Sequence, residues 1–329
     1  MTADARVFRT NAWVQAWLDV WGKDPRITLI DVGGAAKPQE FLYTAPVTLK
    51  RIIPATALCL AGVGYGSLST PRAEYNDIES LINCVGDISA LSKMLSSLRW
   101  NHWCVPDVLS NTLQSSHVEA IGQSMNAYVH IPKKEIAYAV GAIEFTDYLA
   151  QLGANTRLAY FHRRERLKKI GEIYIETYSI DKAFEFFALL NQFHVSRWGG
   201  ACYSHQSQQF LKNFMERLVD ESGAALLEVM RVNGEVVSVL FDVVYQGRRY
   251  NFQSGYAENK FPKIALGALH MGFAIQSALE SKQIYDFMAG EGKNTNYKNR
   301  IATLREEIQQ INIERGAIAW LRHLQHKFS

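Results

Sequence analysis

The sequence predicts an α/β fold of the α+β kind, in which mixed, mostly antiparallel sheets carry flanking helices and are divided between two domains. The chain has 329 residues, which exceeds the usual size of one domain. Residues 224–288 read as three strands joined by two tight turns, then a long apolar helix and one more strand. Hydrophobic residues make up 48% of the chain and charged residues 20%, as in ordinary globular proteins.

The segment 224–288 decides the type of sheet. Its turns are Asn233-Gly234 and Gln246-Gly247, and Asn-Gly tolerates the positive φ angles that a tight hairpin needs. The expected strands are Ala225–Val232, Val236–Tyr245, Arg248–Tyr256 and Ile284–Met288, and the expected helix is Ile264–Ser281. Because that helix connects two neighbouring strands by a right-handed crossover, these two strands must be parallel and the sheet must be mixed.

The first half alternates short helices and strands. The glycine-rich stretch Leu58–Leu68 is interpreted as a strand with a bulge; the alternative, a phosphate-binding loop, lacks the lysine and the helix that should follow. The other elements expected in this half are the helix Asn11–Trp21, the strands Ile27–Val32 and Phe41–Val47, a helix from Asp87 to Arg99, the helix Val108–Met125, and a strand Ala127–Ile131 that ends before Pro132.

Residues 145–171 form the most basic part of the chain and are expected to be two helices or one bent helix. Only Glu165 interrupts its basic run, which consists of Arg157, Arg163, Arg164, Arg166, Lys168 and Lys169. Such a run is either a solvated helix face or a site for a phosphate-bearing ligand, and the sequence leaves both open.

The remaining elements complete the second half. They are the strand Glu172–Tyr178, the helix Lys182–Trp198 capped by Asp181, the helix Gln206–Asp220, the loop Ala289–Arg300, the strand Glu306–Ile313 and the helix Ala317–Lys327. Domain limits of 1–140 and 141–329 follow, with the last strand and helix able to pack back on the first domain.

Composition excludes several functional classes. A net charge of +3 does not by itself indicate nucleic-acid binding, and no apolar run is long enough to span a membrane. The four cysteines are far apart, without metal spacing, so we expect reduced thiols, no metal and a cytoplasmic protein without a signal peptide.

Four sequence pieces follow one another between residues 155 and 298. They are Asn155-Thr156-Arg157 with the basic helix after it, Phe193-His194-x3-Trp198, the strand end Tyr250-Asn-Phe-Gln-Ser-Gly-Tyr256, and Tyr285-Asp-Phe-Met-Ala-Gly-Glu291 with Tyr297-Lys298. Together they resemble the CelD/BcsL-like branch of the GNAT superfamily of acyltransferases, named for association with bacterial polysaccharide biosynthesis. The first half is similar to the degenerate N-terminal GNAT-like domain of the same proteins, and the plan resembles FemAB-type transferases, so we expect tandem GNAT-like domains.

The resemblance implies a site for an acyl donor, acetyl-CoA or a longer acyl-CoA, with an acyl carrier protein as a further possibility. The parallel strands around the crossover helix should splay and admit the pantetheine arm, with Phe252, Gln253 and Ser254 beside it. The helix start at Pro262–Gly267 should face the pyrophosphate. Cations that would add to this site are Lys263, Arg163 and Arg164; Phe261-Pro262-Lys263 stands where the family has Ser-Pro-Gly.

Acyl transfer to an amine also needs a base and a proton donor. The loop residue Glu291 is the first candidate for the base, and Asp286 is either a second candidate or structural. His162 and His194 are alternative bases because the unperturbed pKa of histidine suits the task. Tyr297 is expected to donate a proton to the thiolate, and Lys298 to pair with Glu291 or with an acidic substrate. His194 and Trp198 are expected to contact the acceptor, and for Trp198 the alternative is a packing role.

Three functions remain open on the sequence. The first is transfer of an acyl group to a small-molecule amine, such as an amino sugar, amino acid or specialised-metabolite amine, in a cleft between the two domains. The second is FemAB-like transfer from charged tRNA, which the basic helix would suit. The third is a non-catalytic GNAT-like scaffold in a biosynthetic complex.

Overall fold

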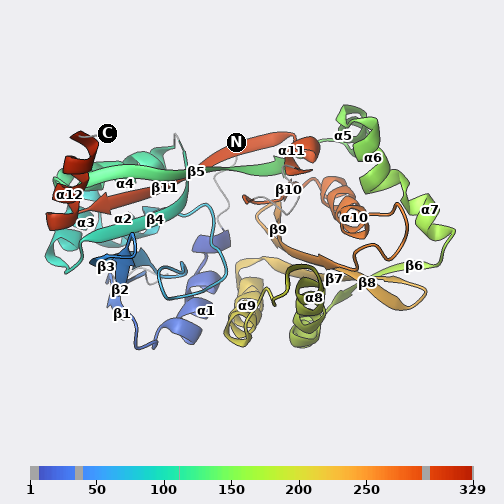
Figure 1. Cartoon of the computed structure of the whole chain (residues 1–329), viewed down its shortest axis with the longest axis horizontal. Helices are drawn as coiled ribbons and strands as arrows, with labels where there is room; N and C mark the ends of the chain where they lie inside the picture. The colour runs from blue at the N-terminus through green and yellow to red at the C-terminus, as the bar shows by residue number, and fades with distance from the viewer. Residues whose placement is uncertain (1–6, 34–39, 111, 291–296, 328–329) are drawn as a thin grey trace. The chain divides into compact units, whose positions relative to one another are not determined.

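The structure is a computed structural model that describes residues 7–33, 40–110, 112–290 and 297–327 (Figure 1). The chain divides into two compact units. Unit 1 contains Ala137–Arg305, and unit 2 contains Arg6–Ile136 together with Glu306–Ser329. No helix of the described residues is both long and apolar enough to cross a membrane.

Unit 1 is built on a mixed sheet in the strand order β5-β10-β9-β8-β7-β6. Only the β9–β10 pair is parallel, and all other neighbours in this sheet are antiparallel. The strands are the part of β5 (Tyr128–Val140) from Ala137 onward, β6 (Ile173–Tyr178), β7 (Ala224–Val232), β8 (Glu235–Tyr245), β9 (Arg248–Tyr256) and β10 (Ile284–Asp286). The expected mixed, mostly antiparallel sheet with flanking helices is therefore confirmed.

The two hairpin turns of this sheet have the backbone that their residues predict. Asn233 and Gly234 have φ angles of 51° and 81°, and Gln246 and Gly247 have 45° and 78°. Two successive positive φ angles are the mark of the hairpin turn whose twist matches that of the strands.

Helices cover both faces of this sheet (Figure 1). Phe241 of β8 packs against Phe186 and Phe187 of α8, whereas its neighbour Leu240 packs in the cluster that contains α10. Because successive strand residues point to opposite faces, α8 and α10 lie on opposite sides of the sheet. The helices are α8 (Ala183–Trp198) and α9 (His205–Leu218) on one face and α10 (Leu266–Glu280) on the other.

The basic segment packs on α10 as a chain of short helical pieces. They are α5 (Phe145–Gln151), α6 (Ala154–Arg157), the π-helical turn η2 (Leu158–His162) and α7 (Arg164–Lys168). A methyl group added to Gly272 of α10 would lie 1.9 Å from the carbonyl oxygen of Tyr160, so the glycine permits this close approach.

The strands of unit 2 follow the order β1-β2-β3-β4-β11, in which β3 and β4 are parallel. Its core contains the fully buried rings of Trp13, Trp17 and Trp103. The elements are β1 (Thr28–Asp31), β2 (Phe41–Leu49), β3 (Ile53–Leu60), β4 (His102–Leu109) and β11 (Leu304–Glu314), with α1 (Asn11–Trp21), α2 (Glu79–Val85), α3 (Ile88–Ser97), α4 (Leu113–Ser124) and α12 (Gly316–Lys327).

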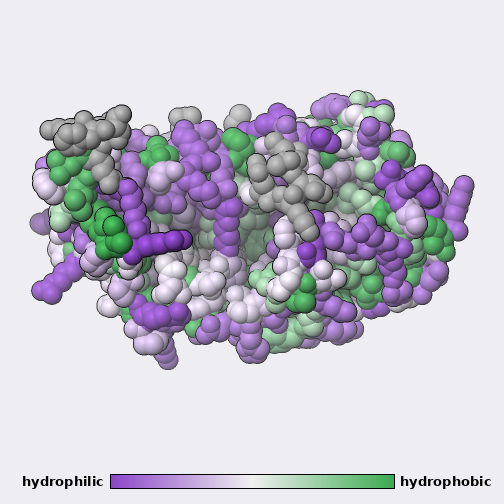
Figure 2. All heavy atoms as spheres, in the orientation of Figure 1, coloured by the Kyte–Doolittle hydropathy of each residue, from purple (hydrophilic) through white to green (hydrophobic). Residues whose placement is uncertain are grey.

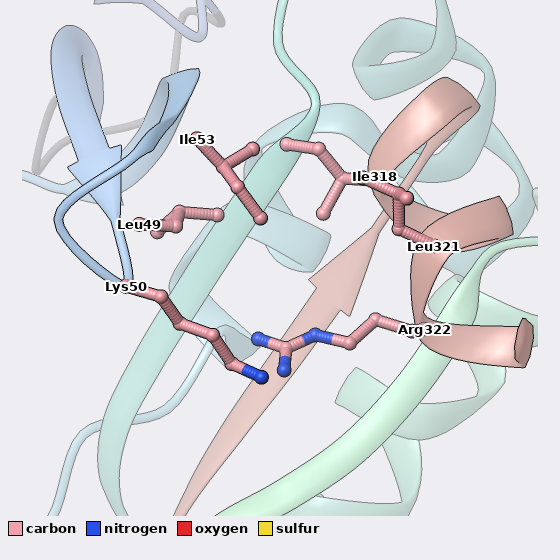
Figure 3. Close-up of a pocket in the computed structure, with 6 residues that line it drawn as sticks. All are labelled: Leu49, Lys50, Ile53, Ile318, Leu321 and Arg322. Carbon is pink, nitrogen blue, oxygen red and sulfur yellow. The ribbon is translucent and has the colours of Figure 1, made fainter. Parts of the chain in front are cut away.

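Helix α12 packs against the β2–β3 hairpin of this unit. Figure 3 shows Ile318 and Leu321 of α12 facing Leu49 and Ile53 across a small apolar hollow. The guanidinium group of Arg322, at its rim with Lys50, donates hydrogen bonds of 2.8 and 3.1 Å to the buried carboxylate of Glu314 on β11.

Several local predictions are wrong. Residues 108–125 do not form one helix, because β4 runs to Leu109 and α4 begins at Leu113. Strand β5 continues through Pro132 to Val140. The glycine-rich stretch after Leu60 is a loop of turns: Gly62 has a φ of 89°, and its carbonyl oxygen accepts a 2.8 Å hydrogen bond from the indole of Trp13.

Two further predictions fail at helix ends. Asp181 lies within the 3-10 turn η3 (Ile180–Lys182) before α8 and does not cap that helix. Residues 297–301, expected in a loop, form the short helix α11 (Tyr297–Ile301).

Candidate functional site

The parallel strands β9 and β10 separate after three residue pairs. Arg248, Arg249 and Tyr250 pair with Ile284, Tyr285 and Asp286, and there the shared ladder ends. Beyond that point the chain after β10 follows β5, because Phe287 donates its backbone N–H to Tyr138 at 2.9 Å. Residues 251–256 of β9 pair only with β8, so one edge of β9 has no strand partner among the described residues.

A β-bulge falls at the start of this open edge. Asn251 pairs with Asp242 and Gln253 with Phe241, which leaves Phe252 as the extra residue. The ring of Phe252 stacks on Phe214 of α9, with centroids 6.2 Å apart, so it packs on the helical layer rather than along the edge. Phe252 therefore contributes its backbone to the opening.

Two side chains form hydrogen bonds with the backbone N–H and C=O of Ser254 on the open edge. The amide oxygen of Gln253 accepts a 3.0 Å hydrogen bond from the N–H of Ser254. His194 of α8 lies with Nε2 3.2 Å from the carbonyl oxygen of Ser254; since a carbonyl only accepts, Nε2 carries the proton. Burial lowers the pKa of His194, and Arg197 lowers it further, so the imidazole is neutral at pH 7.

The start of α10 lies next to the end of β9. Its first residue is Leu266, and the preceding Ala265 offers no side-chain cap, so the first backbone N–H groups have no partner within the helix. A methyl group on the buried Gly267 would lie 2.4 Å from the ring of Tyr256, which shows how closely strand and helix approach. Lys263 is exposed in the preceding turn with a φ of 64°.

The chain after β10 is held by buried polar contacts. The carboxylate of Asp286 is fully buried. It accepts a 2.8 Å hydrogen bond from Arg248 and a 2.6 Å hydrogen bond from the backbone N–H of Met288. The ammonium group of Lys298 donates to the carbonyl oxygens of Met288 and Ala289 at 3.0 and 2.9 Å. Asp286 and Lys298 thus hold the backbone of this turn in place.

Tyr297 and Glu291 were the other residues expected here. Tyr297 begins α11 and is partly buried; burial and the nearby Tyr256 raise the pKa of its phenol to about 12. The phenol therefore keeps its proton at neutral pH and is a potential proton donor. Glu291 lies outside the described residues.

The basic segment presents only part of its charge to solvent. Arg164 lies over the ring of Phe273 at 4.2 Å and donates a 2.6 Å hydrogen bond to Gln276, both on α10. Burial lowers the pKa of Arg164. The side chain therefore attaches the segment to α10, while Arg163 is half-buried and His162 is exposed.

Arg197 is a residue of this region that the sequence reasoning missed. Its guanidinium carbon lies 4.8 Å from the ring centre of Tyr256 and 5.1 Å from that of Trp198, which is half exposed. Its Nε lies 3.0 Å from a carboxylate oxygen of Glu258. The available signal was the spacing of three between His194 and Arg197, which places both on one side of a helix.

A buried polar network beneath α10 was also missed. Arg249 donates from Nε to Asp242 at 2.6 Å and lies 2.9 Å from Glu228. Asn251 donates to the other oxygen of Asp242 at 2.7 Å. His270 of α10 lies 3.0 Å from the hydroxyl of Ser238. Because Asn251 is the first residue beyond the shared ladder, this network holds β9 at the point where it leaves β10.

The described residues contain no cluster of histidine, cysteine or carboxylate groups suited to a metal ion. Residues 154–299 match the family model of an acetyltransferase (GNAT) domain. A search of curated proteins finds no match.

Solved structures share the fold at low sequence identity. A conserved protein of unknown function from Bacteroides thetaiotaomicron has 12% identity and a TM-score of 0.55 over 96% of this chain and 94% of that one. FemX has 10% identity and a TM-score of 0.58 over 97% and 98%. The C-terminal domain of a provisionally assigned lysylphosphatidylglycerol synthetase from Agrobacterium fabrum has 10% identity and a TM-score of 0.54 over 97% of each chain.

Proposed function

We propose that this chain, an acyltransferase by the GNAT domain over residues 154–299, transfers an acyl group from acyl-CoA or an acyl carrier protein to a small-molecule amine. We further infer that it belongs to the CelD/BcsL-like branch of that superfamily. We favour catalysis over the non-catalytic scaffold because residues 154–299 match the family model of an acetyltransferase domain.

The observation that carries the proposal is the open edge of β9. The N–H and C=O of Ser254 are met by the side chains of Gln253 and His194 instead of a strand. A pantetheine arm contains amide groups that can take these two hydrogen bonds in the manner of an added strand. The donor thioester then lies along the edge near the bulge at Phe252, where a backbone N–H can polarise its carbonyl.

The start of α10 suits the anionic end of the same donor. Unpaired N–H groups and the helix dipole at Leu266–Ala268 favour a phosphate group. The exposed ammonium group of Lys263, three residues before the helix, adds positive charge beside it. Backbone groups thus bind the donor along most of its length, so that few charged or polar side chains are needed to hold it.

The chemical step is a direct attack on the thioester. The amine nitrogen forms a bond to the carbonyl carbon, the C–S bond breaks, the nitrogen gives up a proton and the thiolate receives one. We assign the second proton transfer to Tyr297, whose pKa of about 12 keeps the phenol protonated. Glu291 remains the proposed base, and the hydrogen bond from His194 to Ser254 argues against that histidine while the edge is unoccupied.

Purified protein with acetyl-CoA and a medium-chain acyl-CoA tests the proposal. We expect a rise in melting temperature with either donor, and release of free thiol that depends on an added amine. Lys263→Glu should weaken donor binding by reversing a charge beside the phosphates. Lys23→Glu, the same change at an exposed lysine of unit 2, is the control. Absence of any thermal shift with both donors and with an acylated carrier protein would rule the proposal out.

A second candidate is FemAB-like transfer from charged tRNA. The likeness to FemX over nearly the whole of both chains favours it, and so does the basic segment with exposed Arg166, Lys168 and Lys169. Reversing Arg163 and Arg166 to Glu should then weaken binding of charged tRNA and reduce its dependence on salt. Unchanged affinity for charged tRNA in this double variant would exclude it.

A further inference from the structure

Arg197 is held rigidly at the end of α8. Its guanidinium group stacks near the rings of Tyr256 and Trp198, at 4.8 and 5.1 Å, and its Nε is fixed 3.0 Å from Glu258. The side chain is only 19% exposed. A guanidinium held in this way has already lost the side-chain entropy that binding a ligand would otherwise cost.

The outer edge of this guanidinium group has no protein partner in the described ranges. Its two terminal nitrogens make no hydrogen bond to any residue of these ranges, and the buried Nε lies 3.0 Å from Glu258 without the geometry of a hydrogen bond. Partly buried N–H groups without acceptors are costly unless water or a ligand meets them. Only Nε is fully buried without a hydrogen-bond partner, so water reaches the two terminal nitrogens and the acceptor group of a ligand can replace it.

Arg197 acts electrostatically on His194 of its own helix, on Tyr256 at the end of β9 and on Tyr297 of α11. The fork lies 4.8 Å from the ring of Tyr256 at the end of β9, and His194, three residues earlier on α8, contacts Ser254 on the same strand. Glu258 is the one carboxylate paired with it in the described residues, and that contact uses Nε.

We propose that the terminal nitrogens of Arg197 bind a carboxylate of the acyl acceptor, so that the acceptor is an amine that also carries a carboxylate. This inference rests on the proposed function, which supplies the amine and the donor site. It narrows the acceptor from amines in general to amino acids, acidic amino sugars and related amino-carboxylates. Trp198, half exposed beside the fork, forms an apolar wall for the part of the acceptor between its two charged ends.

A carboxylate fits this position better than a phosphate of the donor. The planar fork matches two carboxylate oxygens with two parallel N–H bonds. Glu258 offsets the charge of Arg197, so the pair has little net positive charge to neutralise a group that carries two or more negative charges. The donor phosphates already have the start of α10 and Lys263 in the proposed function.

The test measures binding and turnover of matched amine pairs. The probes are the twenty amino acids with their carboxamides, and glucosamine with 2-amino-2-deoxyglucuronic acid. Isothermal titration reports binding to the full chain, and thiol release from acetyl-CoA reports turnover. The variants are Arg197→Gln and Arg197→Lys, with Arg99→Gln, an exposed arginine of unit 2, as control. Melting temperatures of all three establish that they are folded.

We expect at least one carboxylate probe to bind more tightly than its neutral partner. Arg197→Gln should then reduce its affinity and kcat/KM about ten- to a hundredfold, the range for a charge-assisted hydrogen-bonded pair. Arg197→Lys should recover only part of this loss, because lysine lacks the fork. The KM for acetyl-CoA should stay unchanged in both, as should every parameter in Arg99→Gln.

The outcomes separate this inference from the function on which it rests. Arg197-dependent carboxylate binding without thiol release would support the inference and remove the proposed activity. Turnover with no preference for the carboxylate probe, or with a preference that Arg197→Gln leaves intact, would overturn the inference alone. A raised KM for acetyl-CoA with unchanged acceptor preference would assign Arg197 to the donor phosphates and also overturn it. Failure of every carboxylate probe to bind would do the same.

Discussion

The imidazole of His194 donates from Nε2 to the carbonyl oxygen of Ser254, 3.2 Å away, at an edge of β9 that no strand covers. A side chain of α8 thus takes the place of a missing strand partner. In the proposed function this contact gives way when the donor amides bind. In the absence of a donor, the hydrogen bond from His194 therefore satisfies the carbonyl group of Ser254, and the donor must displace it. The variant His194→Ala tests this.

His194→Ala should bind acetyl-CoA more tightly than the unmodified chain. The substitution removes a competitor for the Ser254 carbonyl, and a neutral hydrogen bond contributes about 0.5–1.5 kcal/mol, so the gain is roughly two- to tenfold. Isothermal titration measures it, and His117→Ala in unit 2 controls for loss of an imidazole. Weaker binding in His194→Ala would instead make the histidine part of the donor site.

Tyr297→Phe should lower kcat for thiol release with little change in either KM. Proton donation by a positioned group contributes about 10²–10⁴-fold to rate, and the lower end applies to a thiolate, which needs less help to leave. Because the pKa of Tyr297 is about 12, no loss of rate from its ionisation is expected between pH 6 and 9. The control is Tyr245→Phe, at the far end of β8. An equal kcat in Tyr297→Phe would exclude the role.

Gly272→Ala should destabilise the chain strongly. The added methyl group would lie 1.9 Å from the backbone oxygen of Tyr160, and backbone cannot turn aside as a side chain can. Overpacking of this kind costs about 1–3 kcal/mol. Urea unfolding measures the change in free energy, with Gly141→Ala as the matched control, since its methyl group would make only an ordinary 3.5 Å contact. Equal effects of the two substitutions would contradict the close packing of η2 on α10.

Asp242→Ala should be more damaging than loss of an exposed ion pair. It leaves the buried guanidinium of Arg249 with one of its two carboxylate partners, and removing one partner of a buried pair costs about 3–5 kcal/mol. Glu165→Gln, which breaks an exposed pair with Lys168, should change stability far less, because solvent screens that pair. Chemical unfolding of both variants checks the comparison, and similar losses would show that the network is dispensable.

His270 should make the chain less stable as the pH falls below about 6.5. Complete burial, followed by the charge of Arg249, lowers its pKa from 6.5 to about 3. Between these values the unfolded chain binds a proton that the folded chain does not, so the free energy of unfolding falls with decreasing pH by about 1.4 kcal/mol per unit.

The variant His270→Asn isolates this contribution. It can keep the contact with Ser238 but cannot titrate, so its loss of stability from pH 7 to 4.5 should be smaller by about 2–3 kcal/mol. Urea unfolding at the two pH values gives the comparison. The same loss in both proteins would show that His270 is protonated in the folded chain or that it does not titrate in this range.

Prediction from the sequence succeeded where local rules act alone. The Asn233-Gly234 and Gln246-Gly247 turns fixed two hairpins, and the apolar helix before Ile284 required the parallel crossover. It failed where packing overrides a local signal. Pro132 did not end β5, and residues 108–125 divided into a strand and a helix.

The sequence by itself determined the mixed sheet of residues 224–288 and its two hairpin turns. Those features depend on periodicity and turn chemistry, which neighbouring residues carry. Only the tertiary structure decided that Asp286 and Lys298 hold a turn, that Arg164 lies against α10, and that the guanidinium group of Arg197 lies beside Tyr256. Each of these depends on burial and on a partner distant in the chain, and neither can be read from spacing along one strand or helix.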